Sequence, residues 1–309
     1  MSNRYEVEQK FFCNNNDDLI YKVLNFNMKL VDVSYETDEY FTDIESEYIK
    51  SRTCLRIRRK NDKEMEITYK GKSDFLNNLY AKKECNIVQD IKNYDDLVEL
   101  FKNLGFYRYV CVEKARKVYS MTKEDITYNI MIDDIKDLGS FAEFEIICDK
   151  NNIDIDILKD KLNKFIARFD SLKLKEAVLP YRDFVAREIY NRNVTRSFKR
   201  ILVNIGDVIP KINKNGIKEA LCENEAILNF KLINKIMSLG IEVIILYNNL
   251  SEDTLKYIYE NVNLEEKYIF KNTTDLENIS LNDTLIIKND EKNTFSSLAL
   301  VILNWYGKM

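Results

Sequence analysis

Charged residues alternate along several short stretches of this 309-residue sequence. In an extended strand, residues two apart point to the same side, so Glu6, Glu8 and Lys10 would share one side of the first stretch. One interpretation is the solvated face of an antiparallel sheet, which is the usual origin of such alternation. The same spacing recurs further along the chain, at Arg56 and Arg58, at Glu64, Glu66, Thr68 and Lys70, at Lys82 and Glu84, at Lys114 and Arg116, at Asp133, and at Glu143 and Glu145.

The separation of acidic from basic residues favours a binding site over a solvated face. If the sheet closes, its first and last strands meet, and their carboxylates cluster beside the cations of the middle strands. Clustered carboxylates repel one another unless a cation joins them, and an oxygen-only site suits Mg²⁺ or Mn²⁺. Basic side chains without matching acids suit a polyanion. A metal-bound triphosphate satisfies both groups, which are acidic at Glu6, Glu8, Asp133, Glu143 and Glu145 and basic at Arg56, Arg58, Lys70, Lys114 and Arg116.

The composition excludes several classes of function. The chain has no histidine, and its six cysteines form no C-x-x-C pair, which argues against histidine-based catalysis and zinc sites. A net charge of −4 gives no general positive electrostatic field that would attract the phosphates of a nucleic acid. The charged N-terminus and the lack of an apolar run of about 20 residues argue against a signal peptide and a membrane span. We therefore expect a cytoplasmic protein with no nucleic-acid or membrane partner.

The periodicity predicts an α+β protein with two domains. Residues 1–190 alternate with period two and predict an antiparallel eight-stranded β-barrel with flanking helices. The expected helices cover residues 17–26, 94–104 and 153–169. The expected strands cover residues 4–12, 38–44, 52–60, 63–71, 79–88, 110–120, 125–134 and 141–148.

Residues 191–309 predict a smaller α/β Rossmann-like domain, because strands and helices alternate there. Its first strand, in R-I-L-V-N-I-G-D, faintly resembles the haloacid dehalogenase family, with Asn204 and Gly206 at the aspartate positions. Without those aspartates we expect a noncatalytic domain. The expected strands cover residues 200–205, 241–247, 268–271 and 284–288, and the expected helices cover residues 219–239, 252–261 and 294–305.

Several motifs of the first domain together resemble the CYTH superfamily of triphosphate tunnel metalloenzymes, which includes class IV adenylyl cyclases and thiamine triphosphatases. The E-x-E-x-K motif at residues 6–10 is the superfamily's signature, but it is weak evidence alone. Its companions follow in order: the D-x-Y-F-like segment at 38–43, L-R-I-R at 55–58, T-Y-K-G-K at 68–72, L-G-F at 104–106, K-A-R at 114–116, and I-D-D at 132–134 followed by L-G-S-F-A-E-F-E at 138–145.

The resemblance implies roles for individual residues. It implies that the metal is bound by Glu6, Glu8, Asp133, Glu143 and Glu145. It implies that the residues acting in catalysis are Glu6, Glu8, Lys10, Arg56, Arg58 and Lys70. It also implies that the triphosphate is bound by Lys82, Lys114 and Arg116. The sequence departs from the family's R-x-E-x-E segment at Lys82 and Asn86, where substrate geometry can be set.

The resemblance implies turnover of a triphosphate with Mg²⁺ or Mn²⁺. The reaction expected is phosphoanhydride hydrolysis of inorganic triphosphate, a nucleoside triphosphate or thiamine triphosphate. One alternative is class IV adenylyl cyclisation of ATP to cyclic AMP and pyrophosphate, and another is a nonenzymatic nucleotide or polyphosphate sensor. The expected partner is a triphosphate-containing small molecule such as ATP, with a homodimer left open.

Overall fold

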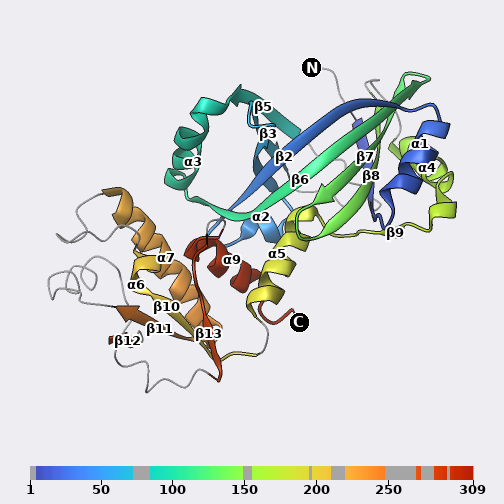
Figure 1. Cartoon of the computed structure of the whole chain (residues 1–309). Coiled ribbons are helices and arrows are strands. Elements are labelled where there is room, and N and C mark those ends of the chain that lie inside the picture. The colour runs from blue at the N-terminus through green and yellow to red at the C-terminus, as the bar shows by residue number, and fades with distance from the viewer. Residues whose placement is uncertain are drawn as a thin grey trace. The chain divides into compact units, whose positions relative to one another are not determined.

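The computed structural model divides the chain into two compact units (Figure 1). It describes residues 5–71, 84–148, 155–194, 197–209, 220–247, 269–272, 282–290 and 293–308. The first unit comprises residues 1–41, 47–103 and 111–185, and the second comprises residues 42–46, 104–110 and 186–309. The domain boundary after residue 190 stays a prediction, because the second unit also takes in short segments of the N-terminal half.

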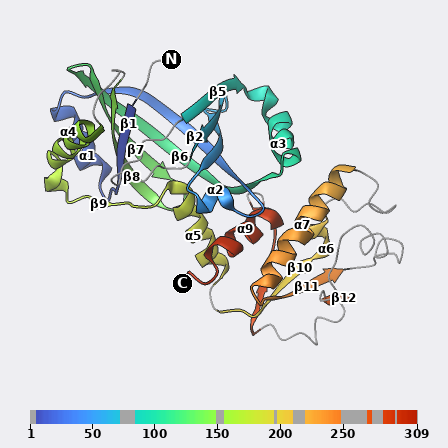
Figure 2. The ribbon, with the colours of Figure 1, turned by 180° about the vertical axis from the view of Figure 1, so that it is seen from behind.

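The N-terminal half forms one large sheet of nine strands, in the order β5-β4-β3-β2-β6-β7-β8-β1-β9 (Figure 2). Neighbours such as β1 and β8, β3 and β4, and β6 and β7 pair antiparallel. The strands are β1 (Tyr5–Phe12), β2 (Lys29–Asp43), β3 (Cys54–Lys60), β4 (Glu64–Lys70), β5 (Glu84–Asp90), β6 (Phe106–Lys123), β7 (Ile126–Ile135), β8 (Gly139–Cys148) and β9 (Lys175–Glu176).

The prediction of a closed barrel is wrong. β5 and β9 are the two edges of the sheet, and within the described ranges they do not pair with each other. β9 instead pairs with β1, with Glu176 opposite Phe11, and the Ala177 N–H donates to the Lys10 carbonyl at 2.8 Å. Alternation shows which face of a strand is buried but not whether two distant edges meet, so closure could not follow from the pattern.

The predicted strands of this half correspond to β1–β8, but β2 begins at Lys29 rather than at residue 38. Residues 31–36 read V-D-V-S-Y-E, so apolar and polar side chains already alternate before residue 38, and this signal was overlooked. The predicted helices correspond to α1 (Asn16–Asn25), α3 (Tyr94–Asn103) and α4 (Ile155–Ala167). The structure adds four elements that were not expected from the sequence: α2 (Glu47–Lys50), α5 (Tyr181–Asn193) and the short 3₁₀ turns η1 (Ile91–Asn93) and η2 (Asp170–Leu172).

Helices α1 and α4 supply side chains to the apolar core on one face of the large sheet. The Asn15 side chain caps α1 by accepting hydrogen bonds from the backbone of Asp17 and Asp18. From β8, the Phe144 ring enters this core, 5.8 Å from the ring centroid of Phe165 and 5.1 Å from that of Phe169.

Because successive strand residues point to opposite faces, the neighbours of Phe144 must point away from this core. Glu143 and Glu145 therefore face the other side of the sheet. We call that side the charged face. Its charged residues include Glu6, Glu8, Lys10, Glu36, Asp38, Arg56, Arg58, Glu66, Lys70, Lys114, Arg116, Asp133, Glu143 and Glu145, and toward the β5 edge Lys60, Glu64, Glu84 and Asp90.

The second unit contains four parallel strands in the order β12-β11-β10-β13. Asn204 ends β10 and is exposed. The predicted helix at 252–261 lies outside the described residues, and the Rossmann-like and haloacid dehalogenase-like assignments stay predictions. The elements of this unit are β10 (Arg200–Asn204), α6 (Ile205–Val208), α7 (Ala220–Ser238), β11 (Glu242–Tyr247), β12 (Ile269–Asn272), β13 (Thr284–Ile286) and α9 (Phe295–Trp305).

Among the residues that the structure describes, no helix combines the length and the apolar character needed to cross a bilayer.

Candidate metal centre

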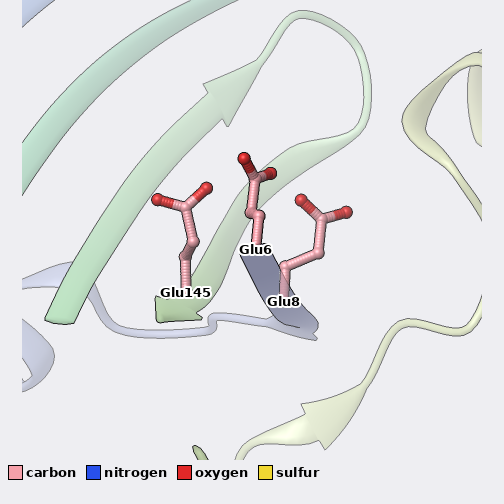
Figure 3. A group of neighbouring side chains, drawn as sticks. All are labelled: Glu6, Glu8 and Glu145. Atoms are coloured by element: carbon pink, nitrogen blue, oxygen red, sulfur yellow. The ribbon is translucent and has the colours of Figure 1, made fainter. Parts of the chain in front are cut away.

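Three glutamates gather on the charged face. Glu6 and Glu8 lie on β1, and Glu145 on β8 stands directly opposite Glu8 in the antiparallel register. One carboxylate oxygen from each residue lies within 4.8 Å of the others. Figure 3 shows the three side chains rising from the two neighbouring strands to the same side. This arrangement offers a cation three oxygen ligands.

The electrostatics of these glutamates favour a bound cation. Burial, followed by the nearby Glu6 carboxylate, raises the pKa of Glu145 to about 8. Burial and Glu143 also raise the pKa of Glu8, against the opposing effects of Lys10 and Lys70. A divalent cation would offset this repulsion, and carboxylate oxygens are the ligands that Mg²⁺ and Mn²⁺ prefer. The residues present therefore fit a hard divalent metal ion.

Asp133 and Glu143, also predicted as metal ligands, are instead paired with basic side chains. Arg116 donates from Nε to Asp133 Oδ1 and from Nη2 to Asp133 Oδ2, both at 2.6 Å. The same Nη2 donates to Glu143 Oε2 at 2.9 Å, and Lys10 Nζ lies 2.7 Å from Glu143 Oε1. Burial alone would raise the pKa of Glu143, but Lys10 and Arg116 hold it well below its ordinary value. The structure thus brings Glu6, Glu8 and Glu145 together and keeps Asp133 and Glu143 in ion pairs. Lys10 Nζ also donates to Glu8 Oε1 at 2.5 Å, so Glu8 belongs to both groups.

The basic side chains of the middle strands surround a fully buried carboxylate, Asp38. Arg58 donates from Nε and Nη2 to the two oxygens of Asp38, at 2.6 and 2.8 Å. Lys114 Nζ donates to Asp38 Oδ2 at 3.0 Å and lies 3.1 Å from Glu36 Oε2. Although burial alone would raise the pKa of Asp38, Arg58 and Lys114 hold it well below its ordinary value. These contacts fix the positions of the cations.

The expectation that these cations have no matching acids is wrong, because Glu36 and Asp38 are their partners. The β2–β3 register places Asp38 directly opposite Arg58. A signal was present in the sequence: Glu36 and Asp38 alternate in the same way as the charged residues of the other strands. It was missed because the strand was expected to begin only at residue 38.

Tyr181, the first residue of α5, is a second residue that the sequence analysis missed. Its hydroxyl donates to Asp133 Oδ2 at 3.0 Å. The Nζ atoms of Lys10 and Lys114 lie 5.6 and 5.7 Å from the centroid of its ring. Tyr181 is 5% exposed, so its ring is buried beside two ammonium groups. No charge alternation marks such a residue in the sequence.

The remaining predicted site residues lie on β3 and β4 or beyond them. Arg56 Nη2 donates to Thr68 Oγ1 at 2.9 Å. Lys70 is close enough to oppose the raised pKa of Glu8, after the larger effects of burial, Glu143 and Lys10. β4 and β1 are not neighbours in the sheet order. Lys82 lies outside the described residues.

Comparison with known proteins decides the family. The model of the CYTH domain matches residues 4–176, which is more than half of the chain. The chain belongs to the CYTH family. The matched region contains the described carboxylates and cations of the charged face.

A relative of this CYTH protein is MJ0240 of Methanocaldococcus jannaschii, a proposed adenylate cyclase. The two are 30% identical over 141 residues, which is 45% of this chain and 75% of the relative. Among solved structures, PH1819 of Pyrococcus horikoshii is 25% identical, with a TM-score of 0.48 over 60% of this chain and 99% of that one. HpAC1 of Hippeastrum, a proposed adenylyl cyclase with a dominant triphosphatase activity, is 11% identical, with a TM-score of 0.46 over 60% and 95%.

Proposed function

We propose that this CYTH protein hydrolyses a phosphoanhydride bond of a triphosphate in a metal-dependent reaction. Inorganic triphosphate, a nucleoside triphosphate and thiamine triphosphate are the candidate substrates. One observation carries the proposal: the glutamate cluster of β1 and β8 shares the charged face with the ordered cations of β3 and β6. A metal-bound polyanion needs both kinds of group side by side.

The charge balance of the charged face supports metal dependence. Within the described residues, its acidic side chains outnumber its basic ones. A triphosphate bound there alone would add negative charge to a surface already in excess of it. Divalent cations at the glutamates would reverse the imbalance, so we expect substrate to bind with metal. The acidic residues include Glu6, Glu8, Glu36, Asp38, Glu64, Glu66, Glu84, Asp90, Asp133, Glu143 and Glu145, and the basic ones include Lys10, Arg56, Arg58, Lys60, Lys70, Lys114 and Arg116.

Glu6, Glu8 and Glu145 would hold the metal, which when bound supplies Lewis-acid polarisation of phosphate oxygens. The cations of the charged face would bind the phosphate oxygens and offset the charge that develops in hydrolysis. Arg116 is already oriented for this role by its paired hydrogen bonds to Asp133. A guanidinium held in advance loses little freedom when substrate binds.

Adenylyl cyclisation of ATP is the second candidate, and the proposed cyclase activity of the relative MJ0240 favours it. In that reaction the ribose 3′ hydroxyl attacks the α-phosphorus and pyrophosphate leaves. The same metal and cation groups would bind the triphosphate. A cyclase additionally needs a pocket that orients adenosine, whereas hydrolysis does not, and for this reason we prefer hydrolysis.

One incubation separates the candidates. The purified protein is mixed with ATP, tripolyphosphate or thiamine triphosphate and with Mg²⁺ or Mn²⁺, and the products are identified. Release of phosphate supports the proposed hydrolase. Cyclic AMP with pyrophosphate from ATP would replace it with the cyclase. No turnover of any of the three substrates would contradict both and leave a binding protein.

The proposed location is the cytosol. The cysteines within the described residues, Cys13, Cys54, Cys85, Cys111 and Cys148, are free, as expected in a reducing compartment.

A further inference from the structure

The carboxylates of the charged face are held by different kinds of partner. Asp133 and Glu143 accept hydrogen bonds from the Arg116 guanidinium. Glu145 accepts one from an uncharged donor, Asn129 Nδ2, at 2.7 Å to Oε2. Asn129 and Glu145 are each 9% exposed, so this hydrogen bond is shielded from water.

The sheet places these residues in one row. Asn129 on β7 stands opposite Glu145 on β8, and Glu145 stands opposite Glu8 on β1. The amide therefore approaches Glu145 from the side away from β1. Because ladder hydrogen bonds fix the register on both sides, the position of Asn129 relative to the glutamate cluster is set by the backbone.

A neutral donor has a different consequence from a cationic one. An arginine or lysine beside Glu145 would orient its carboxylate but would also cancel the charge that attracts a metal ion. The amide of Asn129 fixes one oxygen and adds no positive charge beside the cluster. Metal-ligating carboxylates are commonly oriented by such hydrogen bonds from residues that do not touch the metal.

We propose that Asn129 is a positioning residue that holds Glu145 in the geometry required for a divalent cation shared with Glu6 and Glu8. This inference rests on the proposed function, because it takes that cluster to be the metal site. Asn129 itself acts through Glu145 and does not touch the metal.

The test is Mn²⁺ binding to the full-length protein without substrate, measured from the electron paramagnetic resonance signal of free Mn²⁺. Four proteins are compared: the wild type, Asn129→Leu, Glu145→Gln and the double variant. We expect Asn129→Leu to weaken binding by about 10- to 100-fold, the usual cost of losing an outer-shell partner. In the Glu145→Gln background the same change should have no further effect, since the two residues act as a unit.

Wild-type affinity in Asn129→Leu would overturn the inference while leaving the metal site intact. Losses that multiply in the double variant would also overturn it, because Asn129 would then act independently of Glu145. If the wild type does not bind Mn²⁺, the metal site of the proposed function fails as well. Should the leucine variant not fold, Asn129→Ser is too short to reach Glu145 and carries the same expectation.

Discussion

At the residue scale, Asp38 and Glu145 are two buried carboxylates with opposite surroundings. Asp38 is enclosed by Arg58 and Lys114, and its pKa lies well below the ordinary value although burial alone would raise it. Burial and Glu6 instead raise the pKa of Glu145 to about 8. The first carboxylate is already neutralised by the protein, whereas the second has no ion pair with a cationic side chain among the residues that the structure describes. We therefore propose that Asp38 holds the cations in place and that Glu145 binds a metal ion.

Asp38→Asn tests the first assignment through stability. The change removes one of the two carboxylates that pair with Arg58 and Lys114, while Glu36 stays within 3.3 Å of both cations. Because one counter-charge remains, we expect a loss of up to about 3 kcal/mol, the lower end of the cost of breaking a buried pair. The unfolded-state pKa of an aspartate is about 3.9. Since the folded-state pKa is lower, this stabilisation is present above about pH 4 and is lost as the pH falls through the folded value.

Urea unfolding of the wild type and Asp38→Asn at neutral pH and in acid measures this difference. The free energies of unfolding of the two proteins should converge as the pH falls below about 4. A difference that stays constant across this range would show that Asp38 is not held ionised by its neighbours.

Much of this arrangement could be predicted from the sequence, but the pairing within the charged face could not. Strand alternation places Glu8, Lys10 and Glu143 on a common face because the period of a strand is two. The same pattern does not state that Lys10 contacts Glu143, since that contact depends on the β1–β8 register. For the same reason the neutral partner of Glu145 went unnoticed: Asn129 carries no charge to mark it.

At the element scale, α5 contributes the side chain that closes the charged network. Tyr181 begins the helix and donates its hydroxyl to Asp133, which Arg116 also holds. Its ring packs edge to face on Phe141, with the centroids 5.1 Å apart. The first residue of the helix is thus held against the sheet by one hydrogen bond and by aromatic packing.

Tyr181→Phe separates these two contributions. The variant keeps the ring beside Lys10 and Lys114 and loses the hydrogen bond to Asp133, so we expect a loss of roughly 1 kcal/mol in the free energy of unfolding. Tyr181→Ala should cost more, about 3 kcal/mol or above, because it also leaves a cavity. Equal losses in both variants, measured by chemical denaturation, would show that the ring packing contributes nothing.

The bounds and the pairing of the strands were harder to predict than which side chains share a face of the sheet. The strands from β3 to β8 alternate clearly, so their existence followed from the sequence. The two-residue β9 is too short to show a period, yet it covers part of the outer edge of β1. A pattern that identifies strands says little about short edge pairings, which is why an open sheet was mistaken for a closed barrel.

At the scale of the whole molecule, the proposed chemistry belongs to the sheet of the CYTH region. The second unit has a parallel sheet whose first strand ends at Asn204, where the haloacid dehalogenase family has an aspartate. We expect Asn204→Ala to leave turnover unchanged and to alter stability by no more than about 0.5 kcal/mol, because this side chain is exposed. A steady-state assay of the folded variant checks this, and a loss of turnover would assign chemistry to the second unit.

The most direct test of the metal-site claim is triphosphate turnover by Glu6→Gln. The control is Glu64→Gln, which changes an exposed glutamate at the start of β4 outside the cluster. Because losing an outer-shell partner already costs about 10- to 100-fold, we expect loss of the ligand itself to lower turnover by about 100-fold or more. The control should retain the wild-type rate. Wild-type turnover by Glu6→Gln in the presence of Mg²⁺ or Mn²⁺ would contradict the account.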